Sequence, residues 1–495
     1  MYILYFPISL NSFHSQVGLI FVFNLIVGTG ALTLPSIFHR AGWILSTAVI
    51  IVLAFISGVT STFVIESIAC SAAISKWKSL QSRRRVADNE IRTHENADEV
   101  LNESNESEND TQGESLLLSS RSFYRLDQKI EMGEMASIFF NDAGRTTFYV
   151  CFITYLYGDL SIYSAAVAKS LRDVFCHSLN ASYSNNISDN FDALPCWPER
   201  TVTRLDAYRF SLVTFAVLLG PFVFFNVQKT KYIQVATAIF RWFAFLVMIT
   251  IAVVKIFTEG PQKNPPMINF NGLPALFGAC VYSFMCHHSL PSLIAPINNK
   301  SHIKVFMGLD YLMICSFYVL LAITGVFAFA NLEDLYTLNF IPKSEQNMGF
   351  LKIIEYFLAL FPVFTLSASF PVIAITLKNN LQTLFSGRIR DRSYSSIIRR
   401  VVFPLLAISP PIIVTFFTES VTNLVSFTGS YAGTSIQYFI PAVLVYLARK
   451  VCKNLLGDGI VNKYRSPFQS KLWIIFVIIW ASGCLIMVTI KFSIG

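Results

Sequence analysis

The sequence predicts an all-α protein that crosses a membrane many times. Its 495 residues are 54% hydrophobic and only 14% charged, and the mean hydropathy is +0.53. The 45 phenylalanines and 20 tyrosines suit lipid-facing and interfacial positions. Apolar runs long enough to span a bilayer recur along the chain. A soluble domain of this size does not need so much apolar surface, so the composition favours a polytopic membrane protein.

Hydrophobic length predicts eleven spans, because about 20 apolar residues are needed to cross a bilayer as a helix. The ninth contains Pro410-Pro411, which predicts a kink. The spans lie at residues 17–38, 42–69, 147–173, 207–226, 232–257, 273–296, 306–330, 350–377, 401–418, 421–446 and 472–491. The chain is thus organised as a tail (1–16), helices 1–2 (17–75), a loop (76–146), helices 3–5 (147–257), helices 6–10 (273–446) and helix 11 (472–491).

The segment 76–146 reads as a largely disordered cytosolic loop. Residues 79–130 have few aromatic residues and many Glu, Ser, Asn and Arg residues, a composition that cannot bury a core. Residues 131–141 return to an apolar-polar pattern, which is typical of a helix lying on the membrane surface.

Two signals set the orientation. Lys and Arg are concentrated in the segments that are cytosolic if the amino terminus is cytosolic. Cys176 and Cys196 bracket a polar loop, within residues 176–205, that carries glycosylation sequons at Asn180 and Asn186. A disulfide and glycans there would place that loop on the lumenal or extracellular side. The carboxyl terminus is then lumenal or extracellular as well, in the plasma membrane or a lysosomal or endosomal membrane.

A break in the first span is the most informative local feature. The stretch from Asn24 to Pro35 contains Gly28, Thr29 and Gly30, and lipid offers no partners for the backbone groups that such residues free. A break at membrane depth is tolerated where it faces protein or a water-filled cavity, and there it can bind a small polar ligand or an ion. Glycines that merely allow close helix packing are the alternative.

The sixth span loses helical character in a comparable way around Cys286-His287-His288-Ser289, before Pro291. Spans one and six are five apart, and an odd offset inverts the direction of crossing. Paired interrupted spans in matching places of two halves point to a transporter binding site. Two unrelated kinks are the alternative, because Gly and Pro are common in membrane helices.

Several segments carry a resemblance to known families. Span one is similar to the opening helix of the amino acid/auxin permease superfamily, and Tyr282 to Pro291 resembles the sixth helix of the sodium-coupled neutral amino acid transporters. Closer similarity is to the transmembrane protein 104 family, through Phe23 to Thr33, Tyr157 to Leu160, Phe225 to Tyr232, Tyr336 to Phe340 and Ser466 to Phe468. The resemblance implies two inverted five-helix repeats plus one extra helix, with helices 1 and 6 broken, and a transporter with a poorly defined substrate.

In this fold the substrate lies between the breaks. An amino acid carboxylate would bind N–H groups at a half-helix start, and its ammonium would bind freed carbonyls. The expected substrate-binding residues are Gly28, Thr29, Gly30, Ala31 and Leu32 in the first break, and Ser283, Cys286 and His287 in the second.

The resemblance also implies a sodium site. Asn24 matches an asparagine that helps to hold sodium in the neutral amino acid transporters, and Thr365 and Ser369 offer hydroxyl oxygens from span eight. Hydroxyl groups that bond back to their own helix are the alternative.

Ionisable residues inside spans are expensive, and they are functional candidates by default. Asp159 in span three could pair with Arg241 in span five as a structural ion pair. It could instead carry a proton, alone or with His287 or His288. Glu66, Lys169, Asp310 and Glu355 lie nearer span ends and are expected to reach the interface.

No enzyme is expected. Adjacent histidines on a helix point about 100° apart and cannot easily share one metal, and the chain has no nucleophile elbow or phosphate-binding loop. No cofactor is expected beyond a coupling Na⁺ or H⁺, and the expected partners are an amino acid-like molecule and the lipid bilayer, not nucleic acid. The sequence therefore favours a secondary active transporter of amino acids or similar small zwitterions. A substrate-binding sensor acting through loop 76–146 and a non-transporting structural protein are the alternatives.

Overall fold

The computed structural model describes most of the chain as helices, and no strand occurs within the described residues. These are residues 26–95, 123–176, 195–197, 201–224, 231–262, 265–295, 297, 299–341, 349–386, 398–457 and 459–494. The predictions for Asn24, Asn180 and Asn186 lie outside them.

Within the part of the chain that the structure describes, eight helices are long and apolar enough to cross a membrane. The remaining helices are short or interrupted, including those at both expected breaks. The α-helices are α2 (Thr29–Ala41), α3 (Trp43–Glu95), α5 (Met132–Phe139), α6 (Asp142–Phe175), α7 (Arg204–Leu219), α8 (Lys231–Glu259), α9 (Leu273–Ser283), α10 (Leu290–Ile294), α11 (Ile303–Ala328), α12 (Gly349–Ser386), α13 (Phe403–Phe417), α14 (Val421–Thr428), α15 (Ile440–Leu456) and α16 (Lys471–Ile494).

Shorter elements link these helices. Those of the 3₁₀ type are η2 (Gly220–Val223), η3 (Phe270–Gly272), η4 (His287–Ser289) and η5 (Tyr336–Phe340). Three π-helical elements are η6 (Ile398–Val402), η7 (Gly429–Gly433) and η8 (Ser435–Phe439). The last two lie between α14 and α15, so residues 421–456 form one helical run with an irregular middle.

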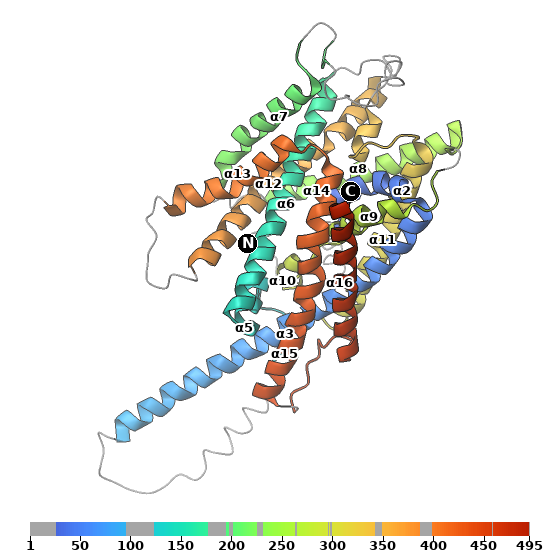
Figure 1. Ribbon diagram of the computed structural model, residues 1–495. Helices are drawn as coiled ribbons and strands as arrows, with labels where there is room; N and C mark the ends of the chain where they lie inside the picture. The colour runs from blue at the N-terminus through green and yellow to red at the C-terminus, as the bar shows by residue number, and fades with distance from the viewer. Residues whose placement is uncertain are drawn as a thin grey trace.

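The broken helix α9 lies at the centre of the bundle. It packs against α2, α14 and η7, while α6 packs along α12 and α3 packs along α15 and α11. Figure 1 shows α6, α12 and α13 grouped to one side of α9, with α2 and α11 on the other. The arrangement surrounds α9 with helices from both halves of the chain.

Helix ends are capped by the residues that favour caps. The Asn141 side chain accepts from the backbone N–H of Gly144 at 2.9 Å at the start of α6, and Thr203 with Asp206 forms a capping box at the start of α7. Each cap satisfies N–H groups that the first helical turn leaves without partners.

Helix α3 corrects the prediction of disorder for residues 76–95, while residues 96–122 of the predicted loop lie outside the described residues. It continues without interruption to Glu95, and Figure 1 shows this extension projecting from the bundle. A helix already nucleated by the membrane-packed turns adds further residues at little cost. Helix α5, in contrast, falls within the predicted surface segment 131–141.

Candidate functional site

The first break is a bend at Val27 and Gly28, immediately before α2 begins at Thr29. Gly28 has extended backbone angles and no side-chain cap, and its carbonyl accepts from the N–H of Ala31 at 3.2 Å. Thr29, Gly30, Ala31 and Leu32 are all buried. The first turn of α2 therefore lies with its backbone N–H groups inside the protein.

The second break separates α9 from α10. Helix α9 ends at Ser283, Phe284 to Cys286 are not helical, and η4 begins at His287. All residues from Ser283 to Leu290 are buried. The expectation of an interruption around Cys286 to Ser289 is therefore met.

The structure brings the two breaks into contact. Gly30 lies so close to Ser283 that an added Cβ atom would sit 2.8 Å from the Ser283 Cα atom. The Tyr318 hydroxyl, from α11, lies 2.9 Å from the carbonyl oxygen of Ile26 and 3.0 Å from that of Ser283. One hydroxyl hydrogen serves two acceptors, so the backbone oxygens freed by both breaks converge on one point.

Asp159 has a partner that was not among the expected ones. Its carboxylate accepts from the Tyr282 hydroxyl at the end of α9. Arg241 lies near the hydroxyl groups of Tyr163 and Tyr318. The ion pair between Asp159 and Arg241, and a proton carried by Asp159, both stay predictions.

The two histidines lie in different environments. His287 is fully buried, and its Nε2 atom lies 2.9 Å from the Thr60 hydroxyl oxygen on α3. The His288 ring packs against Phe152 and Tyr155 of α6, with ring centres 5.6 and 5.5 Å apart. Cys286 points elsewhere again, with its sulfur 3.2 Å from the Tyr311 hydroxyl.

The hydroxyl groups expected at a sodium site bond within their own helix. Thr365 donates to the carbonyl of Phe361 at 2.9 Å, and Ser369 donates to that of Thr365 at 3.2 Å. This is the local bonding that Ser and Thr commonly make in helices. Their oxygen lone pairs still remain as acceptors, so the sodium site stays a prediction. Within the described part of the chain, no group of three or more His, Cys, Asp or Glu side chains is placed to hold a metal ion.

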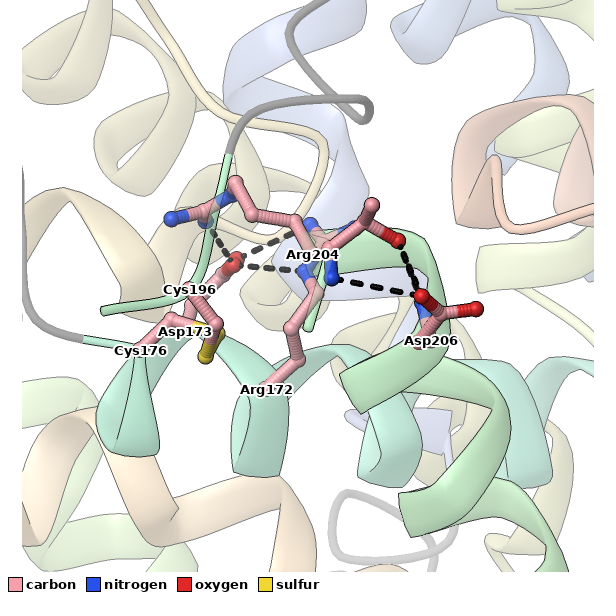
Figure 2. Close-up of a disulfide and its surroundings, with 7 residues drawn as sticks. Arg172, Asp173, Cys176, Cys196, Arg204 and Asp206 are labelled. Carbon is pink, nitrogen blue, oxygen red and sulfur yellow. Dashed lines mark hydrogen bonds and ion pairs between the residues drawn. A yellow bond between two sulfur atoms is a disulfide. The ribbon is translucent and has the colours of Figure 1, made fainter. Parts of the chain in front are cut away.

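One face of the bundle, here called the disulfide face, is fastened by charges and a covalent bond. Cys176 and Cys196 form a disulfide. Figure 2 shows Asp173 beside it, paired with both Arg172 and Arg204. Arg172 also pairs with Glu419 just before α14. The ends of α6, α7 and α14 are therefore held together on this face.

Asp334 is a second junction on the disulfide face. Its carboxylate lies 2.9 Å from Arg40 at the end of α2 and 3.4 Å from Lys169 on α6, and it accepts from Ser420 at 3.2 Å. Burial raises the pKa of this carboxyl, but the positive charges of Lys169 and Arg40 outweigh burial and leave the pKa below its usual value. The helix bearing the first break is thus tied to α6 and α14.

The opposite face carries a buried ion pair. Glu66 on α3 is only 2% exposed, and Arg449 on α15 donates to both of its oxygens at 2.9 and 2.7 Å. The backbone N–H of Ser466 adds a third bond at 2.9 Å. Glu66, Lys169 and Asp310 are all buried in the protein, and their expected position near the interface stays a prediction.

Comparisons with known proteins agree with this architecture. A profile of the family described as "Transmembrane amino acid transporter protein" matches residues 115–490. Transmembrane protein 104 homolog from Drosophila melanogaster is 53% identical, over 97% of both chains. Transmembrane protein 104 from Homo sapiens is 45% identical, over 96% of both chains.

Among solved structures, MhsT in complex with L-phenylalanine shares the fold, with a TM-score of 0.50 and 14% identity. The similarity covers 97% of this chain and 99% of that chain. The fold, the paired breaks and the family profile define a multi-pass membrane protein of the amino acid transporter class. The chain belongs to the transmembrane protein 104 family, and the resemblance seen in its motifs is confirmed.

Several residues of the site escaped sequence reasoning. Tyr318, Thr60, Ser57 and Gln437 are ordinary residues in apolar spans, and only the packing of distant helices brings them to the breaks.

Proposed function

We propose that this protein is a secondary active transporter of amino acids or similar small zwitterions, coupled to Na⁺ or H⁺, with eleven spans arranged as two inverted five-helix repeats and one extra helix. The observation that carries the proposal is the meeting of the two breaks at Tyr318. There, backbone carbonyls freed from Ile26 and Ser283 lie beside the N-terminal turn of α2.

This arrangement matches the two charges of a zwitterion. The α2 N-terminus, with Thr29 and Gly30 in its first turn, favours a carboxylate through its N–H groups and dipole. The carbonyls of Ile26 and Ser283 favour an ammonium group. A fold neighbour in complex with L-phenylalanine supports an amino acid as the class of ligand.

Alternating access would proceed by rocking α2, α3, α9 and α11 against the helices around α6 and α12. Asp334 links these groups on the disulfide face, and Glu66 with Arg449 links α3 to α15 on the other. Opening either side requires its junction to separate. In the proposed orientation the disulfide face is lumenal or extracellular and the amino terminus cytosolic, with glycans at Asn180 and Asn186.

Uptake into proteoliposomes tests the proposal. Purified protein would be offered each of the twenty radiolabelled amino acids under imposed Na⁺ or pH gradients. The matched variants are Gly30→Leu, whose side chain would collide with Ser283, and Gly308→Leu on α11, where nothing lies within 4 Å of an added Cβ. We expect gradient-driven uptake that Gly30→Leu abolishes and Gly308→Leu retains. Equal uptake by both variants would contradict the site.

A sensor is the second candidate function, and the uninterrupted helix α3 favours it. This helix runs from the neighbourhood of the breaks to Glu95 outside the bundle, so ligand occupancy could be signalled along it. Saturable binding of an amino acid without any uptake would favour the sensor, whereas neither binding nor uptake would favour a structural protein.

A further inference from the structure

A polar cluster is buried where α3, η4 and η8 meet. Its members come from three segments of the chain, and each is fully buried: Ser57, Thr60, His287, Gln437 and Tyr438. η4 and α3 each pack against η8, one of two successive π-helical elements. Such π-helical turns occur frequently at functional sites.

Hydrogen bonding defines the tautomer of His287. The Thr60 hydroxyl lies 3.2 Å from the Ile56 carbonyl and 3.1 Å from the Ser57 carbonyl, so its hydrogen is used within α3. Its oxygen must then accept from the His287 Nε2 atom, 2.9 Å away. The same ring also bonds the Ser57 carbonyl, which can only accept. His287 therefore carries its hydrogen on Nε2, and Nδ1 presents a bare lone pair.

Two acceptors in the cluster lack a donor. Neither His287 Nδ1 nor Gln437 Oε1 has a hydrogen-bond partner among the described residues. The Gln437 amide nitrogen donates to the Ser57 hydroxyl oxygen. The atom of this amide that lacks a partner is therefore its oxygen. Buried polar groups without a partner are rare and costly. One proton added to Nδ1 would turn this acceptor into a donor.

The surroundings favour a proton over a metal cation. The cluster has no carboxylate, and imidazole is the side chain that exchanges a proton near neutral pH. The titratable neighbours are His288 and Cys286 on the same segment, with Cys286 bonded to Tyr311, and Tyr438 on η8. The nearest carboxylate on α3 is Glu66, which Arg449 holds, and α10 contributes no titratable group.

We infer that His287 is the proton-carrying residue of the transport cycle, accepting the coupling proton on Nδ1, with Thr60 as its positioning residue. This inference rests on the proposed function. The proton binds the Nδ1 lone pair from the side of the membrane where the proton concentration is higher. It then leaves the same atom toward the other side of the membrane.

Proton movement in proteoliposomes tests the inference. A trapped pH-sensitive dye would record acidification of the interior when an equimolar mixture of the twenty amino acids is added outside, alongside uptake of the same labelled mixture. His287→Gln keeps a donor to Thr60 but removes the Nδ1 acceptor. We expect it to abolish substrate-dependent acidification and the acceleration of uptake by a pH gradient, while the control His302→Gln, at an exposed histidine outside the cluster, retains both. A His287→Gln variant that still couples protons overturns the inference.

Thr60 provides a second test. Thr60→Val removes the oxygen that fixes the tautomer, so we expect it to shift the pH profile of uptake, and Thr60→Ser should restore the profile. A Thr60→Val profile identical to that of the wild type counts against the positioning role.

Nitrogen NMR of ¹⁵N-histidine-labelled protein in bilayers examines the tautomer without transport. The His287 signals are those lost in His287→Gln, and we expect a protonated Nε2 and an unprotonated Nδ1 at neutral pH. The opposite tautomer overturns the inference whether or not transport is seen. If the wild-type protein takes up no amino acid, the proposed function is refuted, and the inference is refuted with it. Uptake that His287→Gln leaves unchanged refutes the inference alone.

Discussion

Tyr318 links the two broken helices through one hydroxyl group. An ammonium group that approaches the carbonyls of Ile26 and Ser283 meets this hydroxyl, because it lies within 3.0 Å of both oxygens. Tyr318 is fully buried, so water does not replace the bond when the hydroxyl is removed. Its contribution can therefore be measured as stability in the absence of substrate.

We expect Tyr318→Phe to destabilise the substrate-free protein by about 1–3 kcal/mol, the usual cost of a buried acceptor left unsatisfied. Thermal unfolding in detergent would measure the change. Tyr446→Phe is the matched control, because Tyr446 is 43% exposed on the bundle surface. Equal midpoints for the two variants would show that the bridge contributes nothing.

The environment of Asp334 predicts that the stability of the protein depends on pH through this one carboxyl group. Lys169 and Arg40 hold its pKa below the ordinary value of 3.8. A carboxyl whose pKa is lower in the folded state stabilises the fold at pH values above its unfolded-state pKa. This stabilisation is lost as the pH falls through the folded-state pKa. We expect the midpoint difference between wild type and Asp334→Asn to be constant from pH 7 to about pH 5 and to shrink below 3.8. A difference that grows on acidification would contradict this assignment.

At the scale of elements, α9 and the segment joining α14 to η7 cross at their backbones. A Cβ atom on Gly278 would collide with the Ser426 carbonyl, and one on Gly429 would collide with the Gly278 carbonyl. Backbone atoms cannot move aside as a side chain can. The crossing therefore depends on two glycines from distant parts of the chain, a use of small residues that is common between membrane helices.

Gly278→Ala should separate these elements and abolish uptake, even though alanine is the better helix former. Gly483→Ala on α16, where nothing lies within 4 Å of the added Cβ, should leave uptake unchanged. Initial uptake rates and size-exclusion profiles of both variants would check this. Normal uptake by Gly278→Ala would mean that the crossing tolerates separation.

Some of these elements could be predicted from the sequence, for a physical reason. Gly28 and the residues from Cys286 to Ser289 weaken a helix locally, so both breaks were local signals, whereas α2 continues through Pro35. Glu66 and Arg449 are 383 residues apart, and their pairing depends on how α3 lies along α15. The same holds for Asp159, because nothing local reveals that Tyr282 faces it.

The extension of α3 was not predicted, because the local composition favours disorder. Residues 76–95 have the charged, apolar-poor composition of a disordered segment, and that composition decides the outcome when a segment stands alone. Here the segment continues a helix that is already formed and packed, so the cost of nucleation does not arise.

For the whole molecule, the disulfide face provides a test of orientation. In sealed right-side-out vesicles, a membrane-impermeant maleimide added after mild reduction should label Cys176 and Cys196. The double variant Cys176→Ser/Cys196→Ser should not be labelled. A cysteine placed at the exposed Ser82 of α3 in that background should react only after permeabilisation. Labelling of Ser82→Cys in sealed vesicles would reverse the proposed orientation.

The long helix α3 has a mechanical consequence. Its 53 residues extend about 80 Å at 1.5 Å per residue, whereas the hydrocarbon core of a bilayer is only about 30 Å thick. Residues 76–95 project past the bundle as roughly 30 Å of this helix. A small tilt of α3 beside the breaks displaces this far end, where a fluorophore would report each turn of the cycle.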